Sequence, residues 1–371
     1  MTIYEQVLGF IEAPEAASFE SLALEVFRFQ FANVAVYRAY CQSRGASPEN
    51  VRSLAEIPYA STLAFKYAEV ANVAHDAGAG LTFLTSGTTK GFAERGRHRV
   101  PQPEIYRAAA IAHLRRMLFP DGARLAMLAM HPTAERMPES SLSRMISWCI
   151  EEFGAGAIGC VATRQGVDAA GAAAFLAGTA ARREPVCVLG TTASFAALFE
   201  RLRADGSPIR LAAGSRIMDT GGAKGQAAPL SAAAVVEAAG ELLGVAPALA
   251  INEYGMTEMC SQLYDATPFN RPGAAGTPGA RMKLAPPWLK PVALDPVTMR
   301  PMAAGAVGML AFFDLANVGS ISALMTEDFG VVRGDAVAIL GRAAAGGPRG
   351  CALAIDEFAE RELARVTAHR Q

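Results

Sequence analysis

The 371-residue chain is 51% hydrophobic and 19% charged, so it is long and apolar enough to bury a large core. A formal net charge of −1 argues against nucleic acid or an anionic membrane as a general partner. The N-terminus lacks the basic start of a secretory signal, no apolar run has the length of a membrane span, and six cysteines lie scattered. We therefore expect a cytoplasmic protein with free thiols.

The predicted elements begin with helices in the first 60 residues, including one apolar periodic stretch over 19–45 that ends at Gly45. Helical patterns then alternate with runs of strand length. One helix, SSLSRMISWCIEEFG, begins after a cap at Ser140 or Ser141. The expected strands are 125–130, 185–191, 246–255, 308–313 and 335–341. This alternation predicts an α/β fold with a mainly parallel sheet flanked by helices on both sides.

The segment 81–100, LTFLTSGTTKGFAERGRHRV, opens an apolar run into a loop of hydroxyls and glycine. Thr85, Ser86, Gly87, Thr88, Thr89 and Lys90 form this loop, and the basic residues Arg95, Arg97, His98 and Arg99 follow it. Such a turn offers backbone N–H groups and hydroxyls to an anion, and Gly87 permits close approach of the backbone. An ordinary strand–turn of small polar residues has the same composition, and the spacing differs from that of a P-loop.

The motif FLTSGTTKG resembles the phosphate loop of the adenylate-forming enzymes, the superfamily of acyl-CoA synthetases, adenylation domains and luciferases. The segment 251–262, INEYGMTEMCSQ, resembles the family's Tyr-Gly-x-Thr-Glu motif. The resemblance implies ATP phosphates in the loop from Thr85 to Lys90, Asn252 near the base, Tyr254 stacked on adenine and Gly255 in the same ATP site. It also implies that Thr257 contacts the α-phosphate and that Glu258 holds Mg²⁺.

Two further segments follow the family's pattern. In RIMDTGGAKG, the resemblance implies that Gly221, Gly222 and Ala223 line the adenine. In the segment 324–342, it implies that Asp328 binds the ribose and that Arg342 lies near the same sugar, whereas Asp335 is expected in a surface turn. His131 follows a predicted strand and is either an ordinary loop residue or part of the acyl pocket.

The end of the chain selects a branch of this superfamily. Only residues 343–371 follow Arg342, and they contain no lysine that could act as the C-terminal lysine of a complete adenylate-forming enzyme, a role for which Lys90 is a candidate substitute. The motifs together resemble the acyl-protein synthetases of the LuxE type over about residues 50–360. We therefore expect an adenylate-forming domain at 1–340 and a hinge with a short helical tail at 341–371.

The resemblance implies that an acid, a fatty acid first of all, is activated with ATP and Mg²⁺ and moves to a cysteine near the C-terminus. Cys351 follows a glycine-rich arm beside Arg349 at a predicted helix start, where its thiolate is favoured, and Cys260 is a second candidate. A partner reductase would then accept the acyl group. Two alternatives stay open: transfer to CoA or a carrier protein, and a catalytically silent protein that binds ATP or an acid. A short or aromatic acid is also possible.

Overall fold

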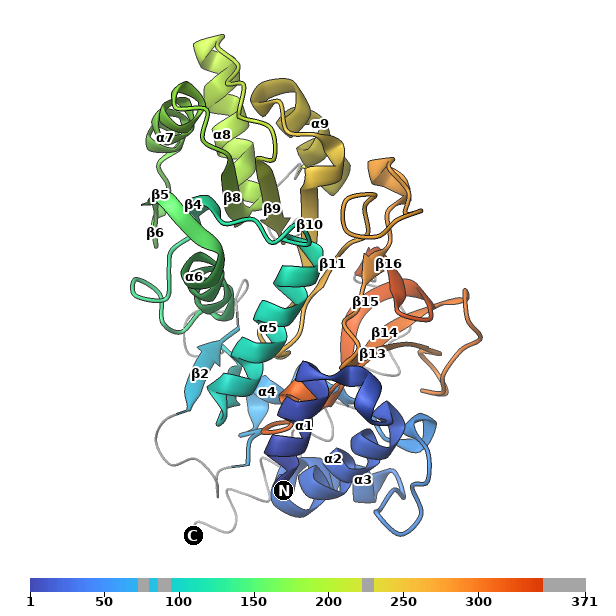
Figure 1. The fold of residues 1–371 in the computed structure, drawn as a ribbon. Helices are drawn as coiled ribbons and strands as arrows, with labels where there is room; N and C mark the ends of the chain where they lie inside the picture. Colours follow the sequence, from blue (N-terminus) through green and yellow to red (C-terminus); the bar gives the residue numbers. More distant parts are fainter. Residues whose placement is uncertain (73–79, 86–94, 222–229, 343–371) are drawn as a thin grey trace. The chain divides into compact units, whose positions relative to one another are not determined.

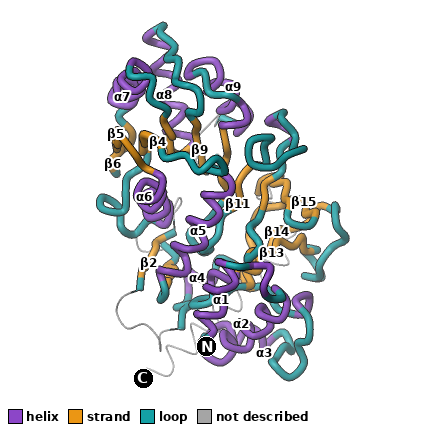
Figure 2. Tube along the Cα trace, viewed as in Figure 1, coloured by secondary structure: helices purple, strands orange, loops and turns teal. Residues whose placement is uncertain are grey.

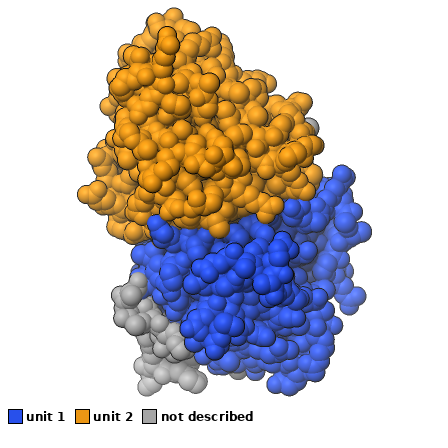
Figure 3. Space-filling model, in the orientation of Figure 1, with its two compact units in different colours: residues 1–109, 257–261, 285–371 blue, residues 110–256, 262–284 orange. Residues whose placement is uncertain are grey.

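A computed structural model describes residues 1–72, 80–85, 95–221 and 230–342 (Figure 1). Helices and strands alternate along most of this chain (Figure 2). Two compact units are distinguished in Figure 3: unit 1 takes in residues 1–109, 257–261 and 285–371, and unit 2 takes in 110–256 and 262–284. The two units subdivide the range that we expected as one domain, and the boundary at residue 341 stays a prediction because the tail lies outside the described residues.

Unit 1 contains helices near its N-terminus and several strands. The helices are α1 (Ile3–Glu12), α2 (Phe19–Asn33), α3 (Ala35–Ser43) and α4 (Ala64–Tyr67), with 3-10 turns η1 (Pro14–Ala16), η2 (Leu54–Glu56) and η7 (Leu315–Asn317). The strands are β1 (Ala60–Ser61), β2 (Leu81–Leu84), β3 (Arg97–Val100), β13 (Leu289–Leu294), β14 (Val307–Asp314), β15 (Ala323–Arg333) and β16 (Ala336–Arg342). Helix α5 (Pro103–Met117) contains the boundary between residues 109 and 110.

The sheet of unit 1 is antiparallel. Strand β14 pairs with β13 and β15, and β15 pairs with β16, while the short β1 lies parallel to β15. Strand β14 is buried from Gly308 to Asp314 and β15 from Ala323 to Thr326, and the ring of Phe19 on α2 packs edge-on against Phe313 on β14. The predicted strands 308–313 and 335–341 are present as β14 and β16, but the alternation of helix and strand did not predict their antiparallel pairing.

The periodic stretch 19–45 forms two helices rather than one, because the chain breaks at Val34. This residue has φ −112° and ψ 94°, ends α2 and begins α3. The guanidinium of Arg38 donates to the carbonyl of Ala32 at 2.9 Å, and Asn33 donates to Phe29 at 2.8 Å. The Arg38 side chain thus satisfies a carbonyl at the end of α2 that a continuous helix would have bonded to its own backbone.

Unit 2 alternates strands with helices. Its strands are β4 (Leu125–Met130), β5 (Gly154–Cys160), β6 (Ala162–Thr163), β7 (Gly166–Val167), β8 (Val186–Thr191), β9 (Arg216–Thr220), β10 (Ala250–Tyr254), β11 (Leu263–Asp265) and β12 (Lys283–Leu284). Its helices are α6 (Ser141–Phe153), α7 (Ala169–Ala181), α8 (Thr192–Asp205) and α9 (Ala232–Leu243), with 3-10 turns η5 (Pro247–Leu249) and η6 (Pro278–Ala280).

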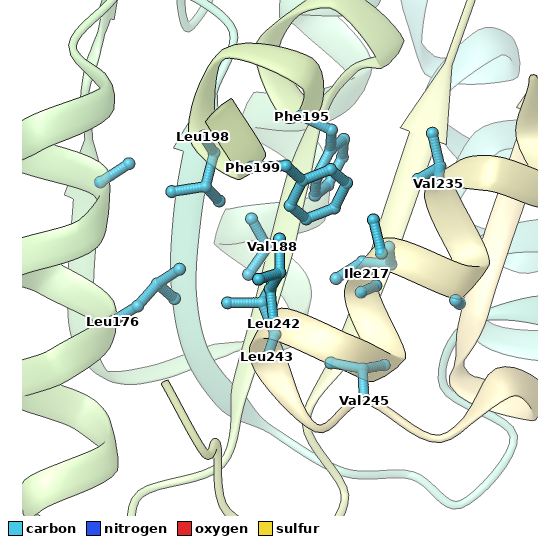
Figure 4. Packing of buried hydrophobic residues seen from close by; sticks show 14 of the residues in the cluster. Leu176, Val188, Phe195, Leu198, Phe199, Ile217, Val235, Leu242, Leu243 and Val245 are labelled. Atoms are coloured by element: carbon cyan, nitrogen blue, oxygen red, sulfur yellow. The ribbon is translucent and has the colours of Figure 1, made fainter. Parts of the chain in front are cut away.

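The sheet of unit 2 is parallel from β5 through β4, β8 and β9 to β10, and β11 and β12 extend it in the antiparallel sense. One face packs on α7, α8 and α9 through a core that includes Val188, Phe195, Phe199 and Leu242 (Figure 4). Alternate strand residues on the other face, such as Met127, are also fully buried. This arrangement confirms the predicted α/β fold with a mainly parallel sheet flanked by helices.

The predicted boundaries in unit 2 are accurate where the pattern was strongest. Residues 125–130 form β4 as predicted, and the hydroxyl of Ser140 caps α6 by accepting from the N–H of Ser143 at 3.2 Å. The strand expected from residue 246 begins at Ala250, because Pro247 starts a 3-10 turn.

Candidate functional site

The candidate residues are divided between the two units, and each group is described within its own unit. Unit 1 carries Thr85, Thr257, Glu258, Asp328 and Arg342, and unit 2 carries Gly221, Asn252, Tyr254, Gly255 and His131. The candidates Ser86, Gly87, Thr88, Thr89, Lys90, Gly222, Ala223 and Cys351 lie outside the described residues.

In unit 1, the ends of the predicted phosphate loop are joined by hydrogen bonds at the base of the β2–β3 hairpin. The N–H of Thr85 donates to the carbonyl of Gly96 at 2.9 Å, and the hydroxyl of Thr85 accepts from the N–H of Gly96 at 2.8 Å. The guanidinium of Arg95 donates to the carbonyl of Thr85 at 2.6 Å. A Cβ on Gly96 would lie 3.1 Å from the backbone of Phe65, so this position favours glycine. Thr85 is buried and anchors the loop.

The basic residues after the loop do not form one cationic patch. His98 has no exposed surface, and burial lowers its pKa to about 4. Arg99 forms an ion pair with Glu69, and Arg95 bonds to carbonyl groups. His98 therefore does not belong to a charged surface, and the ring of Phe65 covers it edge-on at 5.3 Å.

The segment Thr257–Ser261, which carries the Thr-Glu pair, is held in unit 1 by side chains from two other parts of the chain. The Nδ1 of His98 lies 2.6 Å from the carbonyl oxygen of Thr257. The side-chain amide of Asn317 donates to the carbonyl of Glu258 at 2.9 Å. Asp314 accepts from the N–H of Cys260 at 2.9 Å and from the hydroxyl of Ser261 at 2.7 Å. These contacts fix the backbone from which the Thr257 and Glu258 side chains project.

Cys260 is a structural thiol rather than an accessible acyl acceptor. Its side chain is 1% exposed, and its Sγ lies 3.4 Å from the Oδ1 of Asn317. Burial, with the nearby Asp314 carboxylate, raises the pKa of the Cys260 thiol well above its ordinary value, which disfavours the nucleophilic thiolate. Burial also raises the pKa of Asp314, to about 6. The structure thus argues against the second acceptor candidate.

Asp328 and Arg342, which were expected near one sugar, are directly opposite each other in the β15–β16 ladder. The N–H of Asp328 donates to the hydroxyl of Thr326 at 3.0 Å, which fixes the backbone at this point. Asp335 is exposed in the turn that joins the two strands, as predicted.

In unit 2, Gly221 and Tyr254 follow a matched pair of residues at the carboxyl ends of β9 and β10. Thr220 lies opposite Glu253 in the parallel ladder, so Gly221 and Tyr254 come next on the two strands. Gly221 has φ +93°, a conformation that favours glycine, and its carbonyl accepts from the hydroxyl of Thr192 at 2.9 Å. The two candidates for adenine contact therefore share one edge of the sheet.

Beneath this edge lies a buried polar network centred on Asn252. Its amide nitrogen donates to the carboxylate of Asp219 at 2.8 Å, and its amide oxygen accepts from Lys283 at 2.6 Å. Lys283 also donates to Asp265 at 2.9 Å, and Arg281 lies 3.6 Å from the same carboxylate. Because both ends of the Asn252 amide are engaged inside unit 2, this residue supports the strand end from below.

Two carboxyl groups in the network are shifted toward their neutral forms. Burial raises the pKa of Asp219 to about 6 and that of Glu253 to about 7, although Lys283 opposes both shifts. The hydroxyl of Thr220 donates to Glu253. A Cβ on Gly255 would lie 2.4 Å from the Oε1 of Glu253, so a larger residue after Tyr254 would displace this buried carboxyl group.

His131 follows β4 directly, at the carboxyl edge of the parallel sheet. Its Nε2 is buried and has no hydrogen-bond partner among the described residues, and burial lowers the pKa of the ring to about 4. An unpaired buried nitrogen at this edge is consistent with a pocket residue, which stays a prediction.

Sequence reasoning gave no site role to His98, Asp314 and Asn317 in unit 1 or to Asp219, Glu253 and Lys283 in unit 2. The signals were present but weak: His98, Asp219 and Glu253 lie inside the segments singled out above, and DLAN, 314–317, places polar residues in an otherwise apolar region. Within the described part of the chain, no group of three His, Cys, Asp or Glu side chains could hold a metal ion by itself. None of the helices described combines the length and apolar character needed to cross a bilayer.

Comparisons with known proteins place this geometry in context. A family model described as acyl-protein synthetase, LuxE, matches residues 8–359. The long-chain-fatty-acid–luciferin-component ligase of Vibrio harveyi is 35% identical over 79 residues, and that of Aliivibrio fischeri is 30% identical over 90 residues. These matches cover 19% and 22% of this chain and 21% and 24% of the relatives, so the chain spans less than a quarter of their length in these matches.

Solved structures resemble the fold over most of the chain. An open conformation of 2-hydroxyisobutyryl-CoA ligase in complex with 2-HIB-AMP and CoA matches with a TM-score of 0.63 at 16% identity, covering 86% of this chain and 73% of that one. The same ligase in its thioesterification state matches with a TM-score of 0.61 at 16% identity, covering 91% and 68%. The predicted adenylate-forming fold is thereby confirmed.

Proposed function

Because the chain belongs to the LuxE family of acyl-protein synthetases, we propose that it activates a carboxylic acid with ATP and then carries the acyl group on Cys351. A long-chain fatty acid is the first candidate substrate, since two relatives carry that name. The final acceptor would be a partner reductase that supplies its own reducing equivalents and releases an aldehyde.

The proposed reaction has two displacements. A carboxylate oxygen of the acid attacks the α-phosphorus of ATP, the bond to the bridging β-phosphate oxygen breaks, and pyrophosphate leaves. The Cys351 thiolate then attacks the acyl carbon, a thioester forms, and AMP leaves with the electron pair. The first step depends mainly on positioning and on stabilising charge around the α-phosphate.

The observation that carries this proposal is the way unit 1 fixes Thr257 and Glu258. Hydrogen bonds from buried side chains hold the carbonyl groups of both residues. The Thr257 hydroxyl would bind the α-phosphate. Asp328, opposite Arg342 in the same unit, would bind the ribose hydroxyls. These are the groups that adenylation requires.

Glu258 fits a role as Mg²⁺ ligand. Mg²⁺ is commonly bound through one or two carboxylates together with phosphate oxygens and water, so a single partly exposed carboxylate suffices, and no cluster of acids is needed. The ion would neutralise charge on the phosphates. Unit 2 would hold adenine between Tyr254 and Gly221, whose strand ends the buried Asn252 network supports.

Acid-dependent exchange of labelled pyrophosphate into ATP tests the first step, with a panel of long-chain, short-chain and aromatic acids. Exchange with one class would support adenylation and identify the substrate class. Exchange with none of them, in protein shown to bind ATP, would refute the proposal in favour of a silent binding protein.

Retention of labelled acid on denatured protein tests the second step. Cys351→Ser should keep exchange and lose the covalent label, whereas Cys160→Ser, the matched control at a partly exposed thiol, should keep both. Undiminished turnover of Cys351→Ser with added CoA would instead identify a ligase that needs no acyl–enzyme.

A pair of carboxylates on one hairpin tests the ribose contact. Asp328→Asn should raise the KM for ATP about 10- to 100-fold, because it weakens hydrogen bonds to a charged group. Asp335→Asn changes the same residue type in the exposed turn of that hairpin and should leave the KM within about 2-fold. Equal effects of the two substitutions would contradict the assignment.

A further inference from the structure

The segment Thr257–Ser261 lacks the ladder of backbone hydrogen bonds that fixes a strand or helix. It forms a turn and a bend between β10 and β11. A phosphate-binding hydroxyl and a metal-binding carboxylate on such a segment need another source of rigidity, because an error of about 1 Å in placement can lower a rate about 100-fold. In this protein, side chains make the hydrogen bonds that hold the described segment within unit 1.

We propose that His98 and Asn317 are positioning residues that fix Thr257 and Glu258 for adenylation, an inference that rests on the proposed function. His98 lies on β3, the strand that follows the phosphate loop, and contacts the Thr257 carbonyl oxygen at 2.6 Å. Asn317 lies in η7 after β14 and donates to the Glu258 carbonyl at 2.9 Å. The two side chains also meet, with the Nε2 of His98 2.8 Å from the Oδ1 of Asn317.

The surroundings hold both side chains in place. His98 and Asn317 are 0% and 2% exposed, so water does not compete for their hydrogen bonds. The amide of Asn317 also donates to the carbonyl of Ile321 at 2.7 Å, which fixes its orientation, because both bonds need the nitrogen as donor. Gln30 of α2 donates to the Asn317 carbonyl at 3.1 Å. Two separate stretches of the chain therefore hold the Thr-Glu segment, and α2 supports one of them through Gln30.

The contact to Thr257 is the one contact of His98 that touches the Thr-Glu segment directly. Both ring nitrogens face oxygen atoms that only accept, the Thr257 carbonyl at 2.6 Å and the Oδ1 of Asn317 at 2.8 Å. A neutral ring carries one N–H hydrogen and donates to one of them at a time. The bond from Nδ1 to Thr257 holds the segment itself and is therefore the one that a substitution must preserve.

This reasoning defines a matched pair of variants. His98→Asn places an amide donor near the position of Nδ1, and His98→Gln places the same amide one methylene farther, near Nε2. We expect His98→Asn to retain pyrophosphate exchange within about 5-fold of wild type. His98→Gln and Asn317→Leu should lower its kcat about 100-fold, leave the KM for the acid within about 3-fold, and raise the Mg²⁺ concentration needed for half-maximal rate.

Two measurements separate a positioning role from a general structural one. Transfer of the acyl group from supplied acyl-adenylate to the protein bypasses pyrophosphate release, and it should fall less than 5-fold in His98→Gln. Hydrogen–deuterium exchange should show loss of protection in peptides covering 257–261 and unchanged protection in β14 and β15.

The outcomes are distinct. Equal exchange rates in wild type, His98→Gln and Asn317→Leu would overturn the inference while leaving the proposed function intact. An equal fall in both half-reactions, with protection lost across unit 1, would also overturn it. Absence of pyrophosphate exchange in wild type with every acid would refute the proposed function and the catalytic role of the two residues together. Hydrogen–deuterium exchange would still show whether the two residues hold the segment 257–261.

Discussion

Replacement of Lys283 by methionine should destabilise unit 2 strongly. The ammonium of Lys283 donates to the carbonyl of Asn252 at 3.0 Å, to the side-chain oxygen of Asn252 at 2.6 Å and to Asp265 at 2.9 Å. Both charged partners are buried, with side chains 11% and 8% exposed. Lys283→Met keeps most of the side-chain volume but leaves three acceptors without this donor.

The expected magnitude follows from the cost of leaving one buried charge behind. Removal of one partner from a buried ion pair costs about 3–5 kcal/mol. Arg281, 3.6 Å from the same carboxylate, compensates in part, so we expect a loss of about 3 kcal/mol. With a urea m-value of about 2 kcal/mol/M, the unfolding midpoint of unit 2 should fall by about 1.5 M.

The two tryptophans make the assay specific for each unit. Trp148 lies in unit 2 and Trp288 in unit 1, and both are buried, at 6% and 4% exposure. In a Trp288→Phe background, fluorescence therefore follows unit 2 alone. Lys290→Met makes the same chemical change at an exposed position of β13 and should leave this transition unchanged. A midpoint shift below about 0.5 M for Lys283→Met would refute the reasoning about the buried network.

For three further substitutions, the structure determines whether the free energy of unfolding should rise or fall. Because the folded pKa of Glu253 is raised to about 7, the stability it provides is complete below its unfolded pKa of about 4.3 and is lost as the pH rises through 7. As the pH rises from 4 to 8, the free energy of unfolding of Glu253→Gln should therefore rise by up to about 3 kcal/mol relative to wild type. The fluorescence of Trp148 follows this change, and a difference that does not depend on pH would contradict the reasoning. Gly255→Ala should destabilise unit 2 by about 1–3 kcal/mol through steric overlap. Gly279→Ala is the control, because no atom lies within 4 Å of an added Cβ there, and it should change the stability by less than about 0.5 kcal/mol. Equal urea midpoints for the two variants would refute the overlap. Gly9 lies at an exposed position in α1 with open space around it. Because alanine has a higher helix propensity than glycine, Gly9→Ala should stabilise unit 1 by about 0.5–1 kcal/mol in urea unfolding, and a loss of stability would contradict this reasoning.

The fold was predictable where the local pattern and the environment agreed. Strand β4 is buried at every position, so its continuous apolar run LAMLAM gave both ends correctly. Strand β5, with sequence GAGAIGC, was missed because its three glycines carry no strand signal, and pairing with β4 determines its structure. The break at Val34 was missed for a related reason, since side-chain contacts of Arg38 support it.

The site was predictable only as far as its motifs are contiguous in sequence. Thr257 and Glu258 are adjacent, and the spacing between Asp328 and Arg342 is that of a single hairpin, so a short stretch of sequence records each pair. His98 contacts Thr257 across 159 positions and Asn317 across 219 positions. No periodicity or spacing records such distant contacts, so the sequence identified His98 only as one residue of a basic run.

Both units place buried polar side chains next to backbone that lacks regular pairing. In unit 2, Asp219 and Asn252 lie one layer beneath the ends of β9 and β10. In unit 1, Asp314 and Asn317 hold the segment that follows β10 in the chain. Burial of such groups is unfavourable unless every donor and acceptor finds a partner, and apolar residues would fill the same space more stably. Apolar residues, however, could not bond to the carbonyl and N–H groups of an irregular segment. The buried polar groups therefore fix the backbone at the positions where the proposed chemistry needs fixed atoms. Burial of the apolar cores of the two units offsets the loss of stability that these polar groups cause.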